Sequence, residues 1–370
     1  MKILILSCDT GGGHNSAAYA IAEVLENRHI DYIVTDPLTF GKKRTSTRVA
    51  SVYNNMIKNI PSAFGTVYKI GDLYSSTKLR SPVYFANSLY AEKLRLYITD
   101  NGFDHVICTH LFAMEAITAI RRKTEFHIPC FGILTDYTCI PFFSETRLDG
   151  YFIPNSTDLI QELLDKGLKC DHIYGTGIPV SQKFINHIKK SDARAELSIP
   201  QFKPMILIMS GSVGCGNILD LCDEALKQGK NEYSVYILVG KNNELKEKIN
   251  NRYKEYDYIK TVSFTKQVNL YMNAADVMIT KPGGLTSTEA AVANVPLIQL
   301  LAYTGCETKN LNFFSSRGMS VRADNAKTAI SAAWDLILDK NKATQICEIQ
   351  KKYINPNAAD DIVSKVIEYE

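Results

Sequence analysis

Glycines and hydroxyl side chains follow a strand-like run in the segment Thr280–Glu289. Their order predicts a strand, a Pro-Gly-Gly turn and a helix that begins near Thr286. Free backbone N–H groups and a helix N-terminus would then point at one spot, and both favour a phosphate group there. Glu289 lies about one turn into this helix, where its carboxylate can reach a ribose hydroxyl. Many α/β proteins contain a strand–Gly-Gly–helix element, so the hydroxyls and the glutamate carry this interpretation.

A second glycine-rich turn, Gly11–Gly13, follows the first predicted strand and precedes His14. An imidazole at this place can act as a general base near neutral pH; the alternative is a capping imidazole in an ordinary strand–helix turn. Asp136 follows another predicted strand of the same half. Its carboxylate can orient an imidazole or accept a hydroxyl proton, or it can cap the next helix. The residues alone leave both alternatives open.

The second half of the chain opens with a third turn of this kind, Ser210–Gly214. It matches neither the dinucleotide fingerprint nor the P-loop, and Gly240 and Lys241, not an acid, follow the next strand. Binding of NAD is therefore disfavoured, and a loop that cradles a nucleotide phosphate stays open. Near another predicted helix start, Glu307 and Asn310 can hydrogen-bond several sugar hydroxyls, or they form a solvated first turn.

Metal and cofactor chemistry finds little support in the sequence. There is no H-x-x-x-H, CxxC or Asp-x-Asp motif, and the 7 histidines are dispersed. We therefore expect no metal and no cofactor, so that the fold itself must neutralise any leaving group.

Basic charge is concentrated between residues 41 and 95, although the whole chain carries only +3. This stretch holds ten basic residues, Lys42, Lys43 and Arg44 among them, against two acidic ones, with aromatic residues interleaved. Basic residues attract anionic lipid and aromatic faces bind the bilayer interface. We expect contact with an anionic membrane surface; a solvated face is the alternative. Nucleic acid would use similar chemistry, but no recognised motif supports it.

The bulk composition is that of a folded protein of more than one domain. A chain of 370 residues is too long for one ordinary core, and 45% hydrophobic with 22% charged residues is typical of globular proteins. The apolar start of the chain is too short for a signal peptide, and no run of apolar residues is long enough to span a bilayer. The 9 scattered cysteines are expected to be reduced, which indicates a cytoplasmic protein.

Short apolar strands alternate with amphipathic helices in both halves, which predicts two doubly wound parallel α/β sheets. The expected strands are Ile3–Ser7, Tyr32–Thr35, His105–Thr109, Cys130–Leu134, Gly150–Ile153, His172–Tyr174, Met205–Met209, Val235–Val239, Ile259–Val262, Val277–Thr280 and Leu297–Leu300. We expect an amino-terminal domain over 1–180, a carboxyl-terminal domain over 181–354, and a terminal helix over 355–370 that can pack back on the first domain. The glycine-rich turns would lie in a crevice at the carboxyl ends of the strands.

Several of these segments resemble glycosyltransferase family 28, in particular the group of monogalactosyldiacylglycerol synthases and processive diacylglycerol glucosyltransferases. The matching segments are Gly11–Ala18, Leu134–Asp136, Gly175–Pro179, Ser210–Gly214, Ile279–Ala290, Gly305–Glu307 and Asn312–Phe314. They follow the order and spacing of the family from residue 4 to about residue 318.

The resemblance implies a GT-B fold, in which two Rossmann-like domains face each other across a cleft. It implies an inverting hexosyltransferase that moves a sugar from a UDP-sugar to a lipid, most simply diacylglycerol, as a peripheral enzyme at the cytoplasmic face of the cell membrane. The catalytic residues would be His14 and Asp136. The nucleotide sugar would be bound by Gly12, Gly13, Ser210, Gly211, Gly214, Lys281, Gly283, Gly284, Leu285, Thr286, Glu289, Glu307 and Asn310. The acceptor and the membrane would be contacted by Lys42, Lys43, Arg44, Tyr137, Phe142 and Phe143.

Two departures from the family pattern leave the sugar and the acceptor open. The segment Tyr137–Phe143 lacks the histidine that often follows Thr-Asp, and Phe142 or Phe143 stands in for a tryptophan. Cys306 replaces the glutamine of a Gly-Gln-Glu motif. The alternatives are an epimerase or hydrolase of UDP-sugars with the same fold, an N-acetylglucosaminyltransferase acting on a lipid-linked peptidoglycan precursor, and a UDP-sugar sensor without catalysis.

Overall fold

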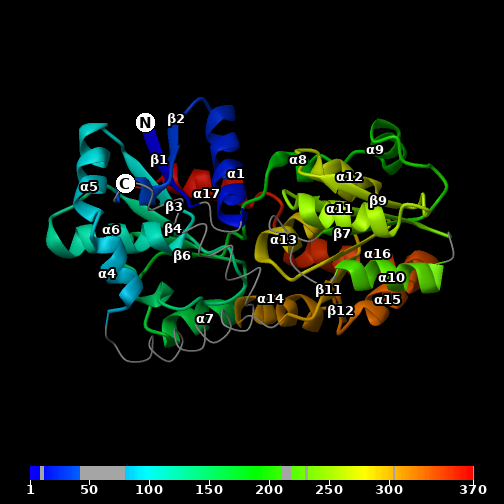
Figure 1. Ribbon diagram of the computed structural model, residues 1–370. Helices are drawn as coiled ribbons and strands as arrows, with labels where there is room; N and C mark the ends of the chain where they lie inside the picture. Colours follow the sequence, from blue (N-terminus) through cyan, green and yellow to red (C-terminus); the bar gives the residue numbers. More distant parts are fainter. Residues whose placement is uncertain (9–11, 42–79, 210–217, 230–231, 303–304, 370) are drawn as a thin grey trace. The chain divides into compact units, whose positions relative to one another are not determined.

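The computed structural model describes residues 1–8, 12–41, 80–209, 218–229, 232–302 and 305–369. These residues form two compact units. Unit 1 comprises residues 1–182, 304–306 and 355–370, and unit 2 comprises residues 183–303 and 307–354. Each unit is built on one six-stranded sheet whose strands all run parallel (Figure 1).

The sheet of unit 1 has the strand order β2-β1-β3-β4-β5-β6. Its strands are β1 (Lys2–Leu6), β2 (Asp31–Thr35), β3 (His105–Cys108), β4 (Cys130–Ile133), β5 (Gly150–Phe152) and β6 (Ile173–Tyr174). Successive side chains of β1 enter different cores: Leu4 and Leu6 pack on one face of the sheet, Ile3 and Ile5 on the other. Both faces are covered, which explains why these strands are continuously apolar.

The helices of unit 1 belong to both faces of its sheet. They are α1 (Gly13–Asn27), η1 (Pro37–Phe40), α4 (Pro82–Ser88), α5 (Ala91–Asp100), α6 (Leu111–Lys123), η2 (Phe143–Glu145), α7 (Thr157–Asp165) and α17 (Ala358–Ile367). The last of these comes from the end of the chain and packs beside α1 in a shared core. Arg28 ties the two helices together, since its guanidinium pairs with Asp360 at 2.6 Å and donates to Ser364 Oγ at 2.8 Å.

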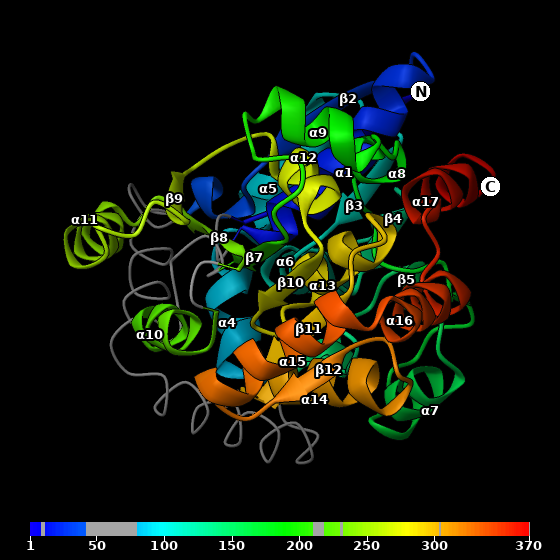
Figure 2. The same ribbon diagram turned by 90° about the vertical axis from the view of Figure 1, so that its right-hand side faces the viewer.

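Unit 2 has the strand order β12-β11-β10-β7-β8-β9. Its strands are β7 (Met205–Met209), β8 (Ser234–Gly240), β9 (Ile259–Ser263), β10 (Val277–Thr280), β11 (Leu297–Leu300) and β12 (Val321–Ala323). The helices are α8 (Gln182–Ile185), which starts at the last residue of unit 1, α9 (Lys190–Glu196), α10 (Ile218–Gly229), α11 (Asn243–Arg252), α12 (Val268–Ala274), α13 (Gly284–Val292), α14 (Gly305–Ser316), α15 (Ala326–Leu338) and α16 (Lys340–Tyr353). Helices α10 and α15 lie side by side against the sheet (Figure 2).

The strand order places a topological switch point in each unit. In unit 1 the chain runs from β1 to β2 on one side and then crosses to β3 on the other side of β1. In unit 2 the chain likewise runs from β7 to β8 and β9 on one side. It then crosses to β10, which pairs directly with β7 on the other side. Ligands of doubly wound sheets bind beyond the carboxyl ends of the strands at such points. The candidate ligand sites therefore follow β1 and β3 in unit 1 and β7 and β10 in unit 2.

The predicted pair of doubly wound sheets is confirmed, and each of the eleven expected strands is present within a residue or two of its expected bounds. The short edge strand β12 was not expected. No helix in the described part of the chain has the combination of length and apolar character needed to cross a bilayer.

Candidate functional site

His14 lies in the first turn of α1, beyond the carboxyl end of β1, and Gly12 in front of it has a φ of +83°. Glycine adopts this left-handed conformation without strain, and it turns the chain from strand into helix. The imidazole Nδ1 lies 2.7 Å from the carbonyl oxygen of Thr109, the residue that follows β3. Thr135 Oγ1, which follows β4, lies 3.2 Å from the same nitrogen. Three neighbouring strand ends thus hold one imidazole.

These contacts assign the tautomer of His14. A carbonyl oxygen can only accept a hydrogen bond, so Nδ1 must carry the proton and donate to Thr109. Nε2 is then the unprotonated nitrogen of the neutral ring, and it is the atom that can accept a proton. Burial lowers the pKa of His14, against the opposing effects of the Asp136 carboxylate and the Thr109 carbonyl. The half-buried ring is therefore a free base near neutral pH.

The other acceptor-side residues predicted in unit 1 follow β4. Asp136 is half-buried and acts on His14 electrostatically. Tyr137 is buried, and Phe143 is completely buried against Tyr151, with ring centroids 5.3 Å apart. Phe142 is half-buried and has a φ of +67°. Phe143 thus serves the core of unit 1, whereas Asp136 and Phe142 retain accessible surface.

The Pro-Gly-Gly turn of unit 2 follows β10 at the switch point, as the sequence predicts. Thr280 Oγ1 donates to the Met209 carbonyl at 3.0 Å and joins the ends of β10 and β7. Gly283 has an ordinary φ of −74°, and a Cβ added to it would meet no atom of the described chain within 4 Å. Neither backbone conformation nor packing of the described residues requires glycine here. Within the described part of the chain, this glycine leaves space open beside the first N–H groups of α13.

Burial along α13 shows which of its residues face that space. Gly283, Thr286 and Glu289 are partly accessible, whereas Gly284, Leu285, Ser287 and Thr288 are buried. A spacing of three residues places the accessible set on one face of the helix. Burial of the Glu289 carboxyl raises its pKa to about 7, with Lys183 opposing the shift. The face therefore offers backbone donors, a hydroxyl and a carboxyl that ionises near neutral pH.

Three further predicted residues support this turn from within the protein. Lys281 Nζ forms an ion pair with Glu307 Oε1 at 2.6 Å, and both side chains are partly accessible. Asn310 is completely buried, and its amide donates to the Pro282 carbonyl at 3.1 Å. The pair joins β10 to α14, and Asn310 fixes the shape of the turn.

Some predicted residues fall outside the described part of the chain. They are Lys42, Lys43 and Arg44 of the basic segment and Ser210, Gly211 and Gly214 of the loop after β7.

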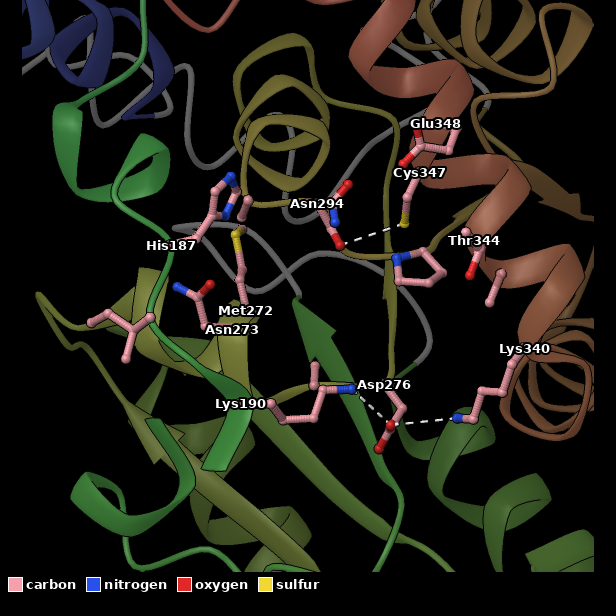
Figure 3. A pocket seen from close by; sticks show the side chains of 15 residues that line it. His187, Lys190, Met272, Asn273, Asp276, Asn294, Lys340, Thr344, Cys347 and Glu348 are labelled. Carbon is pink, nitrogen blue, oxygen red and sulfur yellow. Dashed lines mark hydrogen bonds and ion pairs between the residues drawn. The ribbon is translucent and has the colours of Figure 1, made fainter. Parts of the chain in front are cut away.

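A pocket of about 360 Å³ lies at the opposite, amino-terminal edge of the sheet of unit 2. Asp276 directly precedes β10, and Figure 3 shows Lys190 and Lys340 reaching it from α9 and α16. Their Nζ atoms lie 2.8 Å and 3.7 Å from Asp276 Oδ1, and Arg194 binds Oδ2 at 2.8 Å. These charges bind helices to the sheet, and none of the predicted site residues lines this pocket.

One residue of the unit 1 site was not predicted. His110, directly after Thr109, is 8% exposed, and its ring lies edge-on to that of His14 with centroids 4.4 Å apart. Its position directly after a strand beside the switch point is the signal that could have identified it.

Comparison with known proteins places this geometry in a class. The MurG structure from Acinetobacter baumannii superimposes with a TM-score of 0.63 at 15% identity, covering 100% of this chain and 99% of that one. The UDP-GlcNAc 2-epimerase from Neisseria meningitidis, bound to UDP-GlcNAc, gives 0.63 at 16% identity with full coverage of both chains. At these identities the likeness shows the fold. Two Rossmann-like domains with glycine-rich turns at their switch points define the GT-B class.

Family models resolve the class further. Residues 14–180 match the model of monogalactosyldiacylglycerol (MGDG) synthase, and residues 205–307 match the glycosyltransferase family 28 C-terminal domain. The processive diacylglycerol beta-glucosyltransferase of Bacillus pumilus (strain SAFR-032) is 25% identical over 372 residues, spanning 99% of this chain and 94% of the relative. The chain belongs to glycosyltransferase family 28, in the group of these lipid-glycosylating enzymes, as the sequence motifs predict.

Proposed function

We propose that this protein transfers a hexose from a UDP-sugar to the free hydroxyl of diacylglycerol, with inversion at the anomeric carbon. The observation that carries the proposal is the His14 site: a neutral imidazole at the switch point of unit 1, with Nδ1 bound to a carbonyl and Nε2 left as the base. The relatives support the acceptor, since they are named diacylglycerol beta-glucosyltransferases. UDP-glucose carries its sugar in α linkage, so a β product requires inversion.

The chemistry assigned to His14 is general base catalysis. The acceptor oxygen attacks the anomeric carbon while the bond from that carbon to the diphosphate breaks, and UDP leaves with the bonding electrons. Nε2 of His14 takes the hydroxyl proton, and the resulting imidazolium is stabilised by the Asp136 carboxylate and the Thr109 carbonyl. Such proton transfer contributes about 10²–10⁴-fold to turnover.

The donor is assigned to the accessible face of α13. The first N–H groups of the helix, beside Gly283, would hold the diphosphate and stabilise the charge that grows on it as UDP departs. Thr286 can donate its hydroxyl to a phosphate oxygen, and the Glu289 carboxylate would accept hydrogen bonds from the ribose. With these donors we propose a reaction that needs no metal ion, so activity should survive EDTA.

Membrane attachment is proposed from the sequence of the basic segment. Lys42, Lys43 and Arg44 would hold the enzyme on anionic lipid at the inner face of the cell membrane. Replacing all three by glutamine should weaken binding to anionic vesicles and leave UDP binding unchanged.

The decisive assay incubates purified protein with UDP-glucose or UDP-galactose and vesicles that contain diacylglycerol, with and without anionic lipid. UDP release and glycolipid formation are followed together. UDP release without a lipid product would indicate a hydrolase, a changed UDP-sugar without UDP release an epimerase, and binding without turnover a sensor. Each of these outcomes would refute the proposed transfer.

His14→Ala should lower turnover by about 10²–10⁴-fold and leave UDP affinity unchanged, because the imidazole belongs to the acceptor side. The exposed His127 provides the control, since His127→Ala should retain normal turnover. Turnover near the unmodified level in His14→Ala would remove this residue from the mechanism.

Gly283→Ala tests the donor site without disturbing the fold. The added methyl group meets no described atom and the backbone conformation suits alanine, so thermal stability should be unchanged. UDP affinity, measured by calorimetry, should fall at least about tenfold, because the methyl group would occupy the space assigned to the diphosphate. Unchanged affinity would move the diphosphate elsewhere.

A further inference from the structure

Two histidines share the switch point of unit 1 through direct ring contact. The ring of His110 meets that of His14 at an interplanar angle of 77° with centroids 4.4 Å apart, an edge-to-face arrangement. On its other side His110 meets Phe112, again edge-on at 4.4 Å. With only 8% of its surface exposed, His110 forms a wall against one side of the His14 ring.

The local structure fixes the orientation of His110. It is the N-cap of α6, and its Nδ1 accepts a hydrogen bond from the backbone N–H of Phe112 at 3.1 Å. Nδ1 therefore carries no proton, and the neutral ring is protonated at Nε2. A side-chain cap of this kind stabilises the helix start, so the ring cannot rotate without loss of the cap.

Protonation of both rings together is unfavourable. Burial, together with the nearby His14, lowers the pKa of His110 well below its ordinary value. Among the described residues, two ionisable groups act on His14: Asp136, from the segment after β4, favours the charged ring, and His110, from the segment after β3, packs against it as a neutral ring. The other polar contacts given by these residues are the Thr109 carbonyl and the Thr135 hydroxyl.

We propose that His110 is a positioning residue for His14: its ring, held by the cap of α6, fixes the His14 ring and excludes water from one of its sides. The proposal rests on the proposed function of His14 as the base, which it deepens. Removal of His110 would leave His14 better hydrated and freer to rotate, and hydration favours the imidazolium over the neutral base.

His110→Asn is the variant that tests this role. Asparagine caps helices well, so α6 should keep its start while the ring is lost. NMR of labelled histidine should show the His14 titration moved to higher pH by about half a unit or more. The acid limb of kcat/KM should move in the same direction. The kcat value should fall about tenfold with little change in KM for the UDP-sugar.

Two comparisons separate positioning from helix capping. Ser156→Ala removes the N-cap of α7 in the same unit, and it should lower stability without moving the His14 titration. Asp136→Asn removes the charge that favours the imidazolium, so it should move the titration to lower pH, opposite to His110→Asn. An unmoved titration in His110→Asn would overturn the proposal. So would a His110 ring that titrates near pH 6.5 in the unmodified protein, a measurement that requires no variant.

The NMR readout is independent of turnover. If His14→Ala proved active, the role of His14 as the base would fail while the shifted titration could still be observed. If His14→Ala were inactive and the titration did not move, only the role of His110 would fail.

Discussion

Opposite tautomers of two adjacent imidazoles follow from their backbone partners. The Thr109 carbonyl requires a proton on Nδ1 of His14, whereas the Phe112 N–H requires none on Nδ1 of His110. In each ring, a single main-chain group thus determines which nitrogen carries the proton. A general base needs a free nitrogen near the operating pH, and for His14 that nitrogen is Nε2.

Glu289 gives a prediction at the same scale. Its carboxyl has a pKa of about 7, raised by burial. If ribose hydroxyls donate to it, the ionised form binds the nucleotide more tightly, so UDP affinity should rise as the pH rises from 6 to 8. Calorimetric titrations of UDP across this range provide the measurement.

Glu289→Gln is the control for this pH dependence, because ionisation of UDP itself persists in that variant. The slope of affinity against pH should be smaller in Glu289→Gln than in the unmodified protein. Equal slopes in the two proteins would show that the carboxyl does not contact the ribose.

From the sequence, single candidate residues can be proposed more readily than the residues that contact them. His14, Asp136 and Glu289 are candidates because each stands beside a strand end or a helix start in the chain. The contact of His110 with His14 could not be predicted, although His110 also follows a strand, because it depends on the pairing of β1 with β3 across about a hundred residues. Asn310 was expected to contact sugar, yet it is buried under the turn. Local pattern does not reveal which amide is enclosed.

At the scale of elements, a buried polar network holds α13, the helix after the Pro-Gly-Gly turn, against β11. Gln299 in β11 is completely buried, donates to Ser287 Oγ in α13 at 2.8 Å and accepts from Ser320 Oγ at 2.7 Å. Gln299→Leu would leave both buried hydroxyls without this partner. Each such loss costs about 1–3 kcal/mol, so the free energy of unfolding, measured with urea, should fall by at least ~1 kcal/mol.

Because the network anchors α13, the same variant should also weaken UDP binding. Gln267→Leu is a suitable control, since this glutamine is exposed and its amide donates to Glu196 of α9 and not to α13; the stability and UDP affinity of this variant should stay near the unmodified values. If Gln299→Leu unfolded at the same urea concentration as the unmodified protein, the network would have no net stabilising effect.

Among the features predicted from the sequence, the strands were predicted most successfully. Continuous apolar runs carry a clear signal because both faces of each sheet are covered, and all eleven expected strands exist. β12 was missed for a physical reason: it has three residues, and Arg322 in its middle is exposed, so no apolar run marks it. The strand orders themselves rest on pairings distant in sequence, which a local pattern does not specify.

At the scale of the whole molecule, burial of an ionisable side chain makes the free energy of unfolding depend on pH. Glu115 in α6 is completely buried, and neither carboxyl oxygen has a hydrogen-bond partner in the described part of the chain. Burial, with the nearby Glu145, raises its pKa to about 10, against the opposing effect of Arg122. The folded protein therefore holds a proton here that the unfolded chain releases above its ordinary pKa of about 4.5.

The sign of the effect follows from this difference. Between about pH 4.5 and pH 10 the folded state binds more protons at Glu115, so the free energy of unfolding falls as pH rises, by up to ~1.4 kcal/mol per pH unit. Glu115→Gln removes the proton uptake and places an amide donor near Glu145 Oε1, for which the described residues provide no hydrogen-bond partner. We expect little change at pH 5 and a gain in stability that grows by about 1 kcal/mol per unit towards pH 8. Urea unfolding at several pH values measures it, with the exposed Glu125→Gln as control. Parallel pH dependence in Glu115→Gln and the unmodified protein would mean that Glu115 ionises in the folded state as it does in the unfolded one.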